Sequence, residues 1–199
     1  MNFKEETKDE EEVWTDIKVQ GNDIFFSTDV TSESVCYLFK ILKQLEKRLL
    51  ILMVQLDGYK PEIRLYINSG GGDMFAGFSG HDLLKQMKIK VVTIAMGCCA
   101  SAATFLLLGG HRRLIASTGH VLIHSLASEG FMGKYDEMKD EMKNCNKFME
   151  MIKELYEEHC NIPPTKMKKL MKKDVYLTPQ KCLKWNIVDE IMKPEKINY

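Results

Sequence analysis

A run of twenty residues without a formal charge, Val91 to Gly110, constrains the fold of this chain more than any other feature. Its length would suffice for a membrane-spanning helix. However, its first part, VVTIAMG, is rich in β-branched residues and is typical of a buried strand, whereas ASAATFLLL is typical of a helix. Polar and glycine residues such as Thr93 and Ser101 dilute its apolar character. We therefore interpret the run as a strand over Val91 to Met96, a turn at Gly97 and a helix from about Ala100 to Leu108 in a protein core, and we expect no membrane partner.

A second strand–loop–helix unit precedes this run. IRLYINS predicts a buried strand over Ile63 to Ser69, the glycines Gly70 to Gly72 follow it, and FAGFSGHDLLKQMK predicts a helix. After the charge-free run, RRLIAS and HVLIHS predict two short strands separated by Thr118 and Gly119. Strands that alternate with helices favour an α/β fold whose sheet is mainly parallel.

Further elements are predicted on both sides of these units. DIFFS predicts a short strand, and a long helix follows with Thr31 and Ser32 as capping candidates. Near the C-terminal end, PPTKMKKLMK predicts a helix and DVYL predicts a strand. Another helix is predicted to begin at Thr178, with Pro179 at its first position.

One predicted helix carries an apolar face that needs a partner. Its apolar residues recur at steps of three and four: Tyr135, Met138, Met142, Cys145, Met149, Ile152 and Tyr156. The partner could be a helix of the same chain or a neighbouring subunit, and the residues alone leave both open.

Composition excludes some partners and cofactors. The 28 basic residues balance the 28 acidic ones among 199 residues, so no overall basic field would attract nucleic acid. The six cysteines have neither C-x-x-C spacing nor a zinc-type pairing with histidine, so we expect no metal and reduced thiols in a cytoplasmic protein. Residues 1–12 predict an acidic, disordered tail without the features of a secretory signal, and residues 13–199 predict one domain.

Chemistry is expected where parallel strands end, because ligands gather at the carboxyl edge of such sheets. The glycines Gly70 to Gly72, the segment Gly97 to Ser101 and His124 all lie at predicted strand ends. Exposed glycine amides could bind phosphate or stabilise an oxyanion. The loop lacks the G-K-[ST] and G-x-G-x-x-G patterns of nucleotide sites, and turn glycines remain a simpler alternative.

Ser101 at a helix start could act as a nucleophile if a histidine served as its base. His124 is the candidate base because its apolar neighbours would keep it neutral, and Asp174 could orient it. Each residue also has a structural alternative: a small packing serine, a core histidine and a charge at a helix end. Cys98 and Cys99 are rival nucleophiles that we interpret as buried small residues.

Four ordered blocks resemble the Clp protease proteolytic subunit, ClpP, from about Asn22 to Met192. They are LYINSGGGDMFAGFSGHDLLKQMK, VVTIAMGCCASAATFLLLGG, LIHS and DVYLTPQKCLKWNIVDEI. They are similar to the family's strand–INSPGG–helix block, its MGxAAS nucleophile turn, its MIH strand end and its D-x-[FY]-[LM]-[ST] segment. The resemblance implies an α/β fold of the ClpP/crotonase type, with repeated β-β-α units and a protruding handle helix at about residues 126–160.

The same resemblance implies a serine endopeptidase that hydrolyses unfolded polypeptides without a cofactor. Its nucleophile, base and orienting acid would be Ser101, His124 and Asp174, and the amides of Gly72 and Ala102 would form the oxyanion hole. Implied partners are further copies of the chain, in a heptameric ring that stacks into a tetradecamer around a chamber, and a Clp AAA+ unfoldase.

Departures from the family pattern keep alternatives open. Gly70 stands where the family usually has proline, and Asp73 replaces an apolar residue beside the oxyanion loop. Ser125 and Leu126 replace a Gln-Pro pair, which bears on peptide preference. The alternatives are an acyl-CoA enzyme of the crotonase superfamily and a non-catalytic ring subunit.

Overall fold

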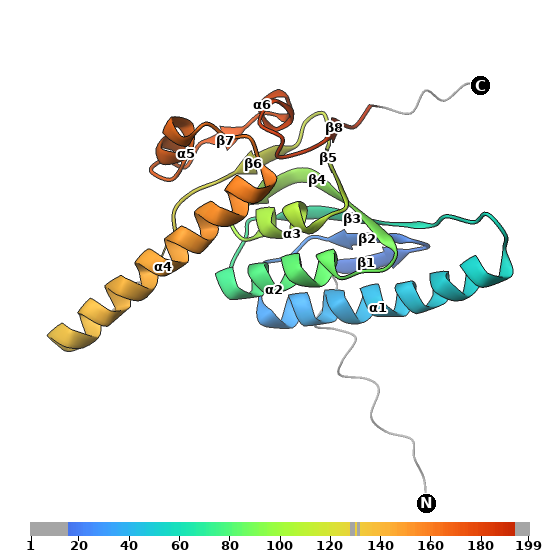
Figure 1. The fold of residues 1–199 in the computed structure, drawn as a ribbon, viewed down its shortest axis with the longest axis horizontal. Coiled ribbons are helices and arrows are strands. Elements are labelled where there is room, and N and C mark those ends of the chain that lie inside the picture. Colours follow the sequence, from blue (N-terminus) through green and yellow to red (C-terminus); the bar gives the residue numbers. More distant parts are fainter. Residues whose placement is uncertain (1–15, 128–129, 131, 194–199) are drawn as a thin grey trace, which may run out of the picture.

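The computed structural model describes residues 16–127, 130 and 132–193 (Figure 1). The tail predicted for residues 1–12 lies outside the described residues. The strands are β1 (Ile17–Gln20), β2 (Asp23–Phe26), β3 (Glu62–Ser69), β4 (Lys90–Ala100), β5 (Arg112–Ile115), β6 (His120–Leu122), β7 (Tyr176–Leu177) and β8 (Glu190–Ile191). The helices are α1 (Ser32–Gln55), α2 (Met74–Lys85), α3 (Ala103–Gly109), α4 (Tyr135–His159), α5 (Pro164–Leu170) and α6 (Pro179–Lys184).

One sheet organises these elements, in the order β1-β2-β3-β4-β5-β8, with β6 attached to β4 and β7 attached to β6. The pairs β2–β3, β3–β4, β4–β5, β4–β6 and β5–β8 are parallel. Only β1–β2 and β6–β7, among the described strands, are antiparallel. The predicted α/β fold with a mainly parallel sheet is therefore confirmed, whereas β1 was not predicted.

Strand β4 is longer than predicted and is bent at Gly97. The sequence predicted a strand that ends at Met96, but β4 continues to Ala100. Gly97 has a φ of +64°, and a Cβ at this position would lie 2.8 Å from Oδ1 of Asn68, so glycine suits the bend. Before the bend β4 pairs with β5, and after it with β6. The predicted turn at Gly97 is thus wrong, and the strand ends immediately before Ser101.

The charge-free run lies in the core. Its second part forms α3, all of whose residues are buried, and most of β4 is buried as well. Figure 1 shows α3 between α2 and the sheet, with α1 beyond α2. In the part of the chain that the structure describes, no helix is long and apolar enough to cross a membrane.

Local capping explains where the first long helix begins. Thr31 is its N-cap: Oγ1 of Thr31 accepts from the amide of Ser34, and the amide of Thr31 donates to Oγ of Ser34. These reciprocal bonds satisfy amides that have no partner within the helix. Of the two capping candidates, Thr31 is therefore the cap and Ser32 the first helical residue.

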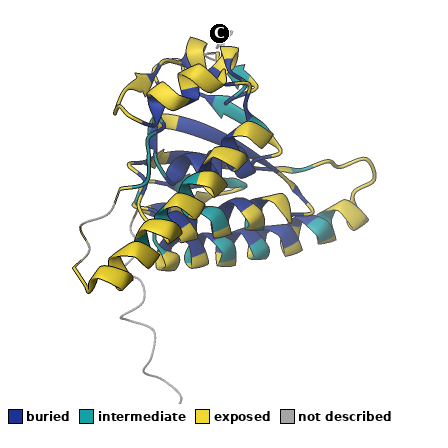
Figure 2. Cartoon of the chain, turned by 60° about the vertical axis from the view of Figure 1, so that its left-hand side comes forward, coloured by how far each residue is buried: buried dark blue, intermediate teal, exposed yellow. Residues whose placement is uncertain are grey.

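Helix α4 leaves the body of the molecule (Figure 1). Its buried residues, Ile152, Leu155 and Tyr156, lie near its C-terminal end. The outer part carries exposed apolar side chains, with Met142 64% exposed, and Figure 2 shows this part mostly as exposed. The predicted apolar face thus packs within the chain over only part of its length.

Candidate active site

Ser101 occupies the sharp turn between β4 and α3. Its φ is +52°, in the left-handed region that residues other than glycine rarely adopt. The backbone is held in this conformation by its neighbours: its amide donates to the carbonyl of Leu122 at 2.9 Å, and its carbonyl accepts from Oγ1 of Thr104 at 2.6 Å. Strain held in place by surrounding structure is frequent at functional sites.

The glycine loop after β3 packs against this turn. Gly71 has a φ of +103° and Gly72 a φ of +143°, so both positions favour glycine. The amide of Val30 donates to the carbonyl of Gly71 at 2.7 Å, and the amide of Asp73 donates to the carbonyl of Val30 at 2.7 Å. These two bonds fix the loop against the segment that precedes α1.

Two amides beside Ser101 are available to a ligand. No hydrogen bond within the described residues uses the amide nitrogen of Gly72 or of Ala102. Both residues line the same cavity as Ser101. Unpaired backbone amides next to a nucleophile can stabilise a negative oxygen that develops during acyl transfer.

Strand pairing places Asp174 beside His124. In the antiparallel pair β6–β7, Leu122 lies opposite Tyr176, and continuing this register by two residues sets His124 opposite Asp174. Nδ1 of His124 lies 3.8 Å from Oδ1 of Asp174, which is longer than a hydrogen bond. The side chain of His124 is 25% exposed and that of Asp174 is 79% exposed. The two form a loose, solvated ion pair when the imidazole is protonated.

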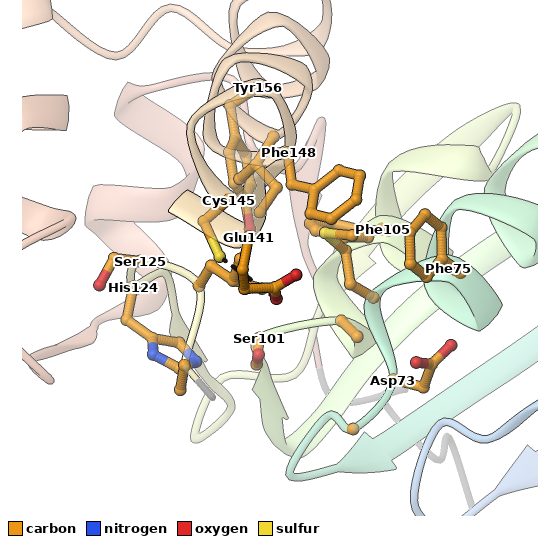
Figure 3. Close-up of a pocket in the computed structure, with 16 residues that line it drawn as sticks. Asp73, Phe75, Ser101, Phe105, His124, Ser125, Glu141, Cys145, Phe148 and Tyr156 are labelled. Carbon is orange, nitrogen blue, oxygen red and sulfur yellow. Dashed lines mark hydrogen bonds between the residues drawn. The ribbon is translucent and has the colours of Figure 1, made fainter. Parts of the chain in front are cut away.

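Ser101 and His124 face one cavity of about 290 Å³ (Figure 3). No hydrogen bond joins their side chains in the described part of the chain. The other histidines lie elsewhere: Nε2 of His81 is 2.7 Å from Nε2 of His159, and Nδ1 of His111 accepts from the amide of Val91. Neither these three nor His120, the fourth, lines the cavity.

The adjacent cysteines Cys98 and Cys99 do not line the cavity either. Cys99 is fully buried, and burial raises the pKa of its thiol well above the usual range, so the thiolate is disfavoured. Cys98 is only partly buried, which corrects the expectation that both cysteines are buried. Its Sγ lies 3.9 Å from the hydroxyl of Tyr176.

Helix α4 forms part of the cavity wall, and the sequence analysis did not predict this contribution. Figure 3 shows Glu141, Cys145, Phe148 and Tyr156 along one side, with Phe75 of α2 and Phe105 of α3 nearby. The residues 141, 145, 148 and 152 follow one another at steps of four, three and four, and therefore share one helix face. That spacing was visible in the sequence, but nothing indicated that this face would lie over Ser101.

A buried hydroxyl chain connects α4 with the serine turn. The hydroxyl of Tyr156 is 2.5 Å from Oγ1 of Thr104, and Oγ1 of Thr104 donates to the carbonyl of Ser101. Because that donation uses the only proton of the Thr104 hydroxyl, Tyr156 is the donor in its own bond. Burial raises the pKa of Tyr156, which keeps the phenol protonated.

The described residues contain no group of three or more histidine, cysteine or acidic side chains that could hold a metal ion. The site therefore offers a hydroxyl, an imidazole, a carboxylate and two amides. Such groups suit acyl transfer.

The family model for Clp protease matches residues 19–195 of the chain. An ATP-dependent Clp protease proteolytic subunit 2 of Treponema denticola is 31% identical over 201 residues, which cover 98% of each chain. An ATP-dependent Clp protease proteolytic subunit of Deinococcus radiodurans is 27% identical over 159 residues, or 78% of each chain. A solved structure of a ClpP1 mutant from Listeria monocytogenes has a TM-score of 0.73 at 23% identity, covering 88% of this chain and 93% of that one, and it shows a similar fold.

Proposed function

The chain belongs to the Clp protease family, and from this premise we propose that it is a serine endopeptidase acting through Ser101, His124 and Asp174. The observation that supports the proposal is the arrangement of these residues, which come from separate segments of the chain. Ser101 and His124 line one cavity, and strand pairing sets Asp174 behind the imidazole. Its substrates would be unfolded polypeptides.

In the first half of the reaction, Oγ of Ser101 attacks the carbonyl carbon of the scissile peptide bond. Nε2 of His124 takes the hydroxyl proton, while Asp174 faces Nδ1 and stabilises the imidazolium that forms. The carbonyl oxygen becomes negative and accepts from the amides of Gly72 and Ala102. The C–N bond then breaks, the imidazolium gives its proton to the leaving amine, and an acyl-enzyme remains.

In the second half, His124 accepts a proton from water, whose oxygen attacks the acyl carbon. The ester bond to Ser101 breaks, the proton passes to Oγ, and a peptide with a free carboxyl group leaves. The reaction needs the imidazole of His124 to reach Ser101, because no hydrogen bond joins their side chains in the described chain. Catalytic hydrogen bonds are often long before substrate binds.

Assembly is also part of the proposal. We infer that residues 13–199 form one domain and that α4 is the handle by which heptameric rings stack around a chamber. The exposed apolar side chains of Tyr135, Met138 and Met142 on the outer part of α4 support this, because such a stripe favours association. The partner that delivers substrate would be a Clp AAA+ unfoldase, in the cytoplasm. Native mass spectrometry should show seven or fourteen chains.

A fluorophosphonate probe tests the serine directly. It should label the wild-type protein at Ser101, and the Ser101→Ala variant should show neither labelling nor cleavage of fluorogenic peptides. Cleavage that persists in Ser101→Ala, in a protein free of contaminating peptidase, would overturn the assignment of the nucleophile.

A second candidate, a non-catalytic ring subunit, is favoured by one observation. The 3.8 Å separation of His124 and Asp174 and the lack of a bond between Ser101 and His124 in the described chain are what a subunit with a disassembled triad would show. Absence of labelling in the assembled wild-type ring would favour this candidate. The acyl-CoA alternative predicts binding of coenzyme A thioesters without labelling.

A further inference from the structure

The rings of Phe75, Phe105, Phe148 and Tyr156 form part of the wall of the cavity beside Ser101. Phe75 and Phe148 meet edge to face with ring centroids 5.1 Å apart, and Phe105 and Tyr156 meet at 6.0 Å. These rings come from α2, α3 and α4, so they form a lining of several elements rather than a single helix face. A cavity of about 290 Å³ with such walls suits one extended side chain of a substrate.

A carboxylate projects into this apolar setting. Figure 3 shows the carboxylate of Glu141 pointing from α4 into the cavity, on the side of Ser101. Among the lining residues, the acidic side chains are those of Asp73 and Glu141, and there is no lysine or arginine. The carboxylic acids that line the cavity thus have no basic side chain of Lys or Arg beside them in its lining.

Glu141 has no cation to pair with in the described part of the chain. Among the described residues, the carboxylate of Glu141 accepts a hydrogen bond from Sγ of Cys145 at 3.8 Å, and thiols are weak donors. The neighbouring acid Asp140 differs, because it pairs with Lys143 at 2.8 Å. Asp73 is also engaged, since its Oδ1 accepts from the amide of Ala76 at 2.6 Å as the N-cap of α2.

We propose that Glu141 makes this subunit select lysine or arginine as the substrate residue on the carbonyl side of the cleaved bond. The inference rests on the proposed serine peptidase function, since it names the side chain that enters the cavity while the carbonyl carbon sits at Ser101. Glu141 is then a specificity-determining residue, and it takes no part in the bond-making steps.

The physical reason is the match between a long basic side chain and the cavity. The methylene stem of lysine or arginine would cover Phe75, Phe105 and Phe148, and its charged end would reach Glu141. A leucine side chain would pack against the aromatic rings but would bury the carboxylate of Glu141 without a partner, which costs free energy. A glutamate side chain would meet a like charge and should be the poorest choice.

We test the proposal on the assembled full-length protein with three fluorogenic tripeptides. They differ only in the last residue, which is lysine, leucine or glutamate. Wild type should cleave the lysine peptide with a kcat/KM about tenfold or more above that of the leucine peptide. Glu141→Gln should lose most of this advantage while cleaving the leucine peptide at least as well as wild type. Glu154→Gln, on an exposed position of α4 outside the cavity, is the matched control and should keep the wild-type preference.

Diphenyl phosphonates with a lysine-like or a leucine-like side chain provide a second readout, because they add covalently to the activated serine and are counted by mass. The lysine-like reagent should react faster with wild type, and raising the salt concentration should reduce its advantage. Equal rates for both reagents, unchanged in Glu141→Gln, would overturn the role of Glu141 while leaving the peptidase intact. If neither reagent nor a fluorophosphonate reacts, the proposed function itself fails.

Discussion

A methyl group on Gly71 would lie 2.6 Å from the Cβ of Ser101. The same methyl group would lie 2.8 Å from the carbonyl oxygen of Ala100, so the loop after β3 and the turn after β4 touch through backbone. Real Cβ atoms do not approach so closely, and neither partner is a flexible side chain. The glycine at this position lets the loop come this close to Ser101.

Gly71→Ala should therefore disrupt the site. We expect the positive φ and the close approach to cost about 1–3 kcal/mol of folding free energy and to displace Ser101 from its turn. Thermal denaturation and fluorophosphonate labelling measure the two effects. Gly70→Ala is the matched control: a Cβ at this position would have no atom within 4 Å, so labelling and stability should persist. Equal behaviour of the two variants would contradict the close packing.

Much of the fold could be predicted because its signals are local. The β-branched first part and the helical second part of the charge-free run became β4 and α3. Thr31 caps α1 through a side chain only three residues away from its partner. By contrast, the bend at Gly97 lies against Asn68 of the neighbouring strand β3. The residue pattern of β4 alone does not reveal that contact.

The candidate site was predictable only in part for the same reason. Ser101, the glycine loop and His124 stand out at predicted strand ends, Asp174 was a candidate to orient His124, and the family blocks pointed to the same residues. The proximity of His124 and Asp174 depends on the register of β6 against β7. Contacts between residues that are far apart in the sequence determine this register. Glu141 was missed because its importance comes from the direction in which α4 crosses the cavity, and a helical repeat does not encode that direction.

Asp174→Asn should reduce activity without affecting stability. An amide in place of the carboxylate no longer stabilises the imidazolium at His124, so we expect kcat to fall by about 10⁴-fold, as for the equivalent change in another triad. The side chain is 79% exposed, so the melting temperature should change little. Peptide hydrolysis and differential scanning fluorimetry measure these effects. Asp57→Asn, in the exposed segment after α1, should change neither; an undiminished kcat in Asp174→Asn would remove Asp174 from the mechanism.

Tyr156→Phe should destabilise the protein by about 0.5–1.5 kcal/mol, because it removes the hydroxyl that donates to Thr104 in a buried site. The ring itself stays, so no large cavity forms. Denaturant unfolding gives the change in free energy, with Tyr59→Phe as the control at a more exposed tyrosine. If Tyr156→Phe matches the control, the hydroxyl chain contributes nothing to the attachment of α4.

Acid should weaken the fold through His159. Partial burial lowers the pKa of His159, and the nearby charges of Lys85, His81 and Arg113 lower it further, while Glu158 acts in the opposite direction. The folded state thus resists protonation, whereas the unfolded chain takes up the proton near pH 6.5. The contribution of neutral His159 to the free energy of unfolding is fully present above that pH. It is lost as the pH falls from there through the lower pKa of the folded state.

The melting temperature should accordingly be lower at pH 5.5 than at pH 7.5, and His159→Gln should show a smaller difference between these two conditions. The Arg113 and Asn186 side chains bind the backbone carbonyl of residue 159, so the substitution leaves those bonds in place. His120→Gln, at an exposed position in β6, should keep the full wild-type difference. A pH dependence that is the same in wild type and His159→Gln would show that other groups cause the acid sensitivity.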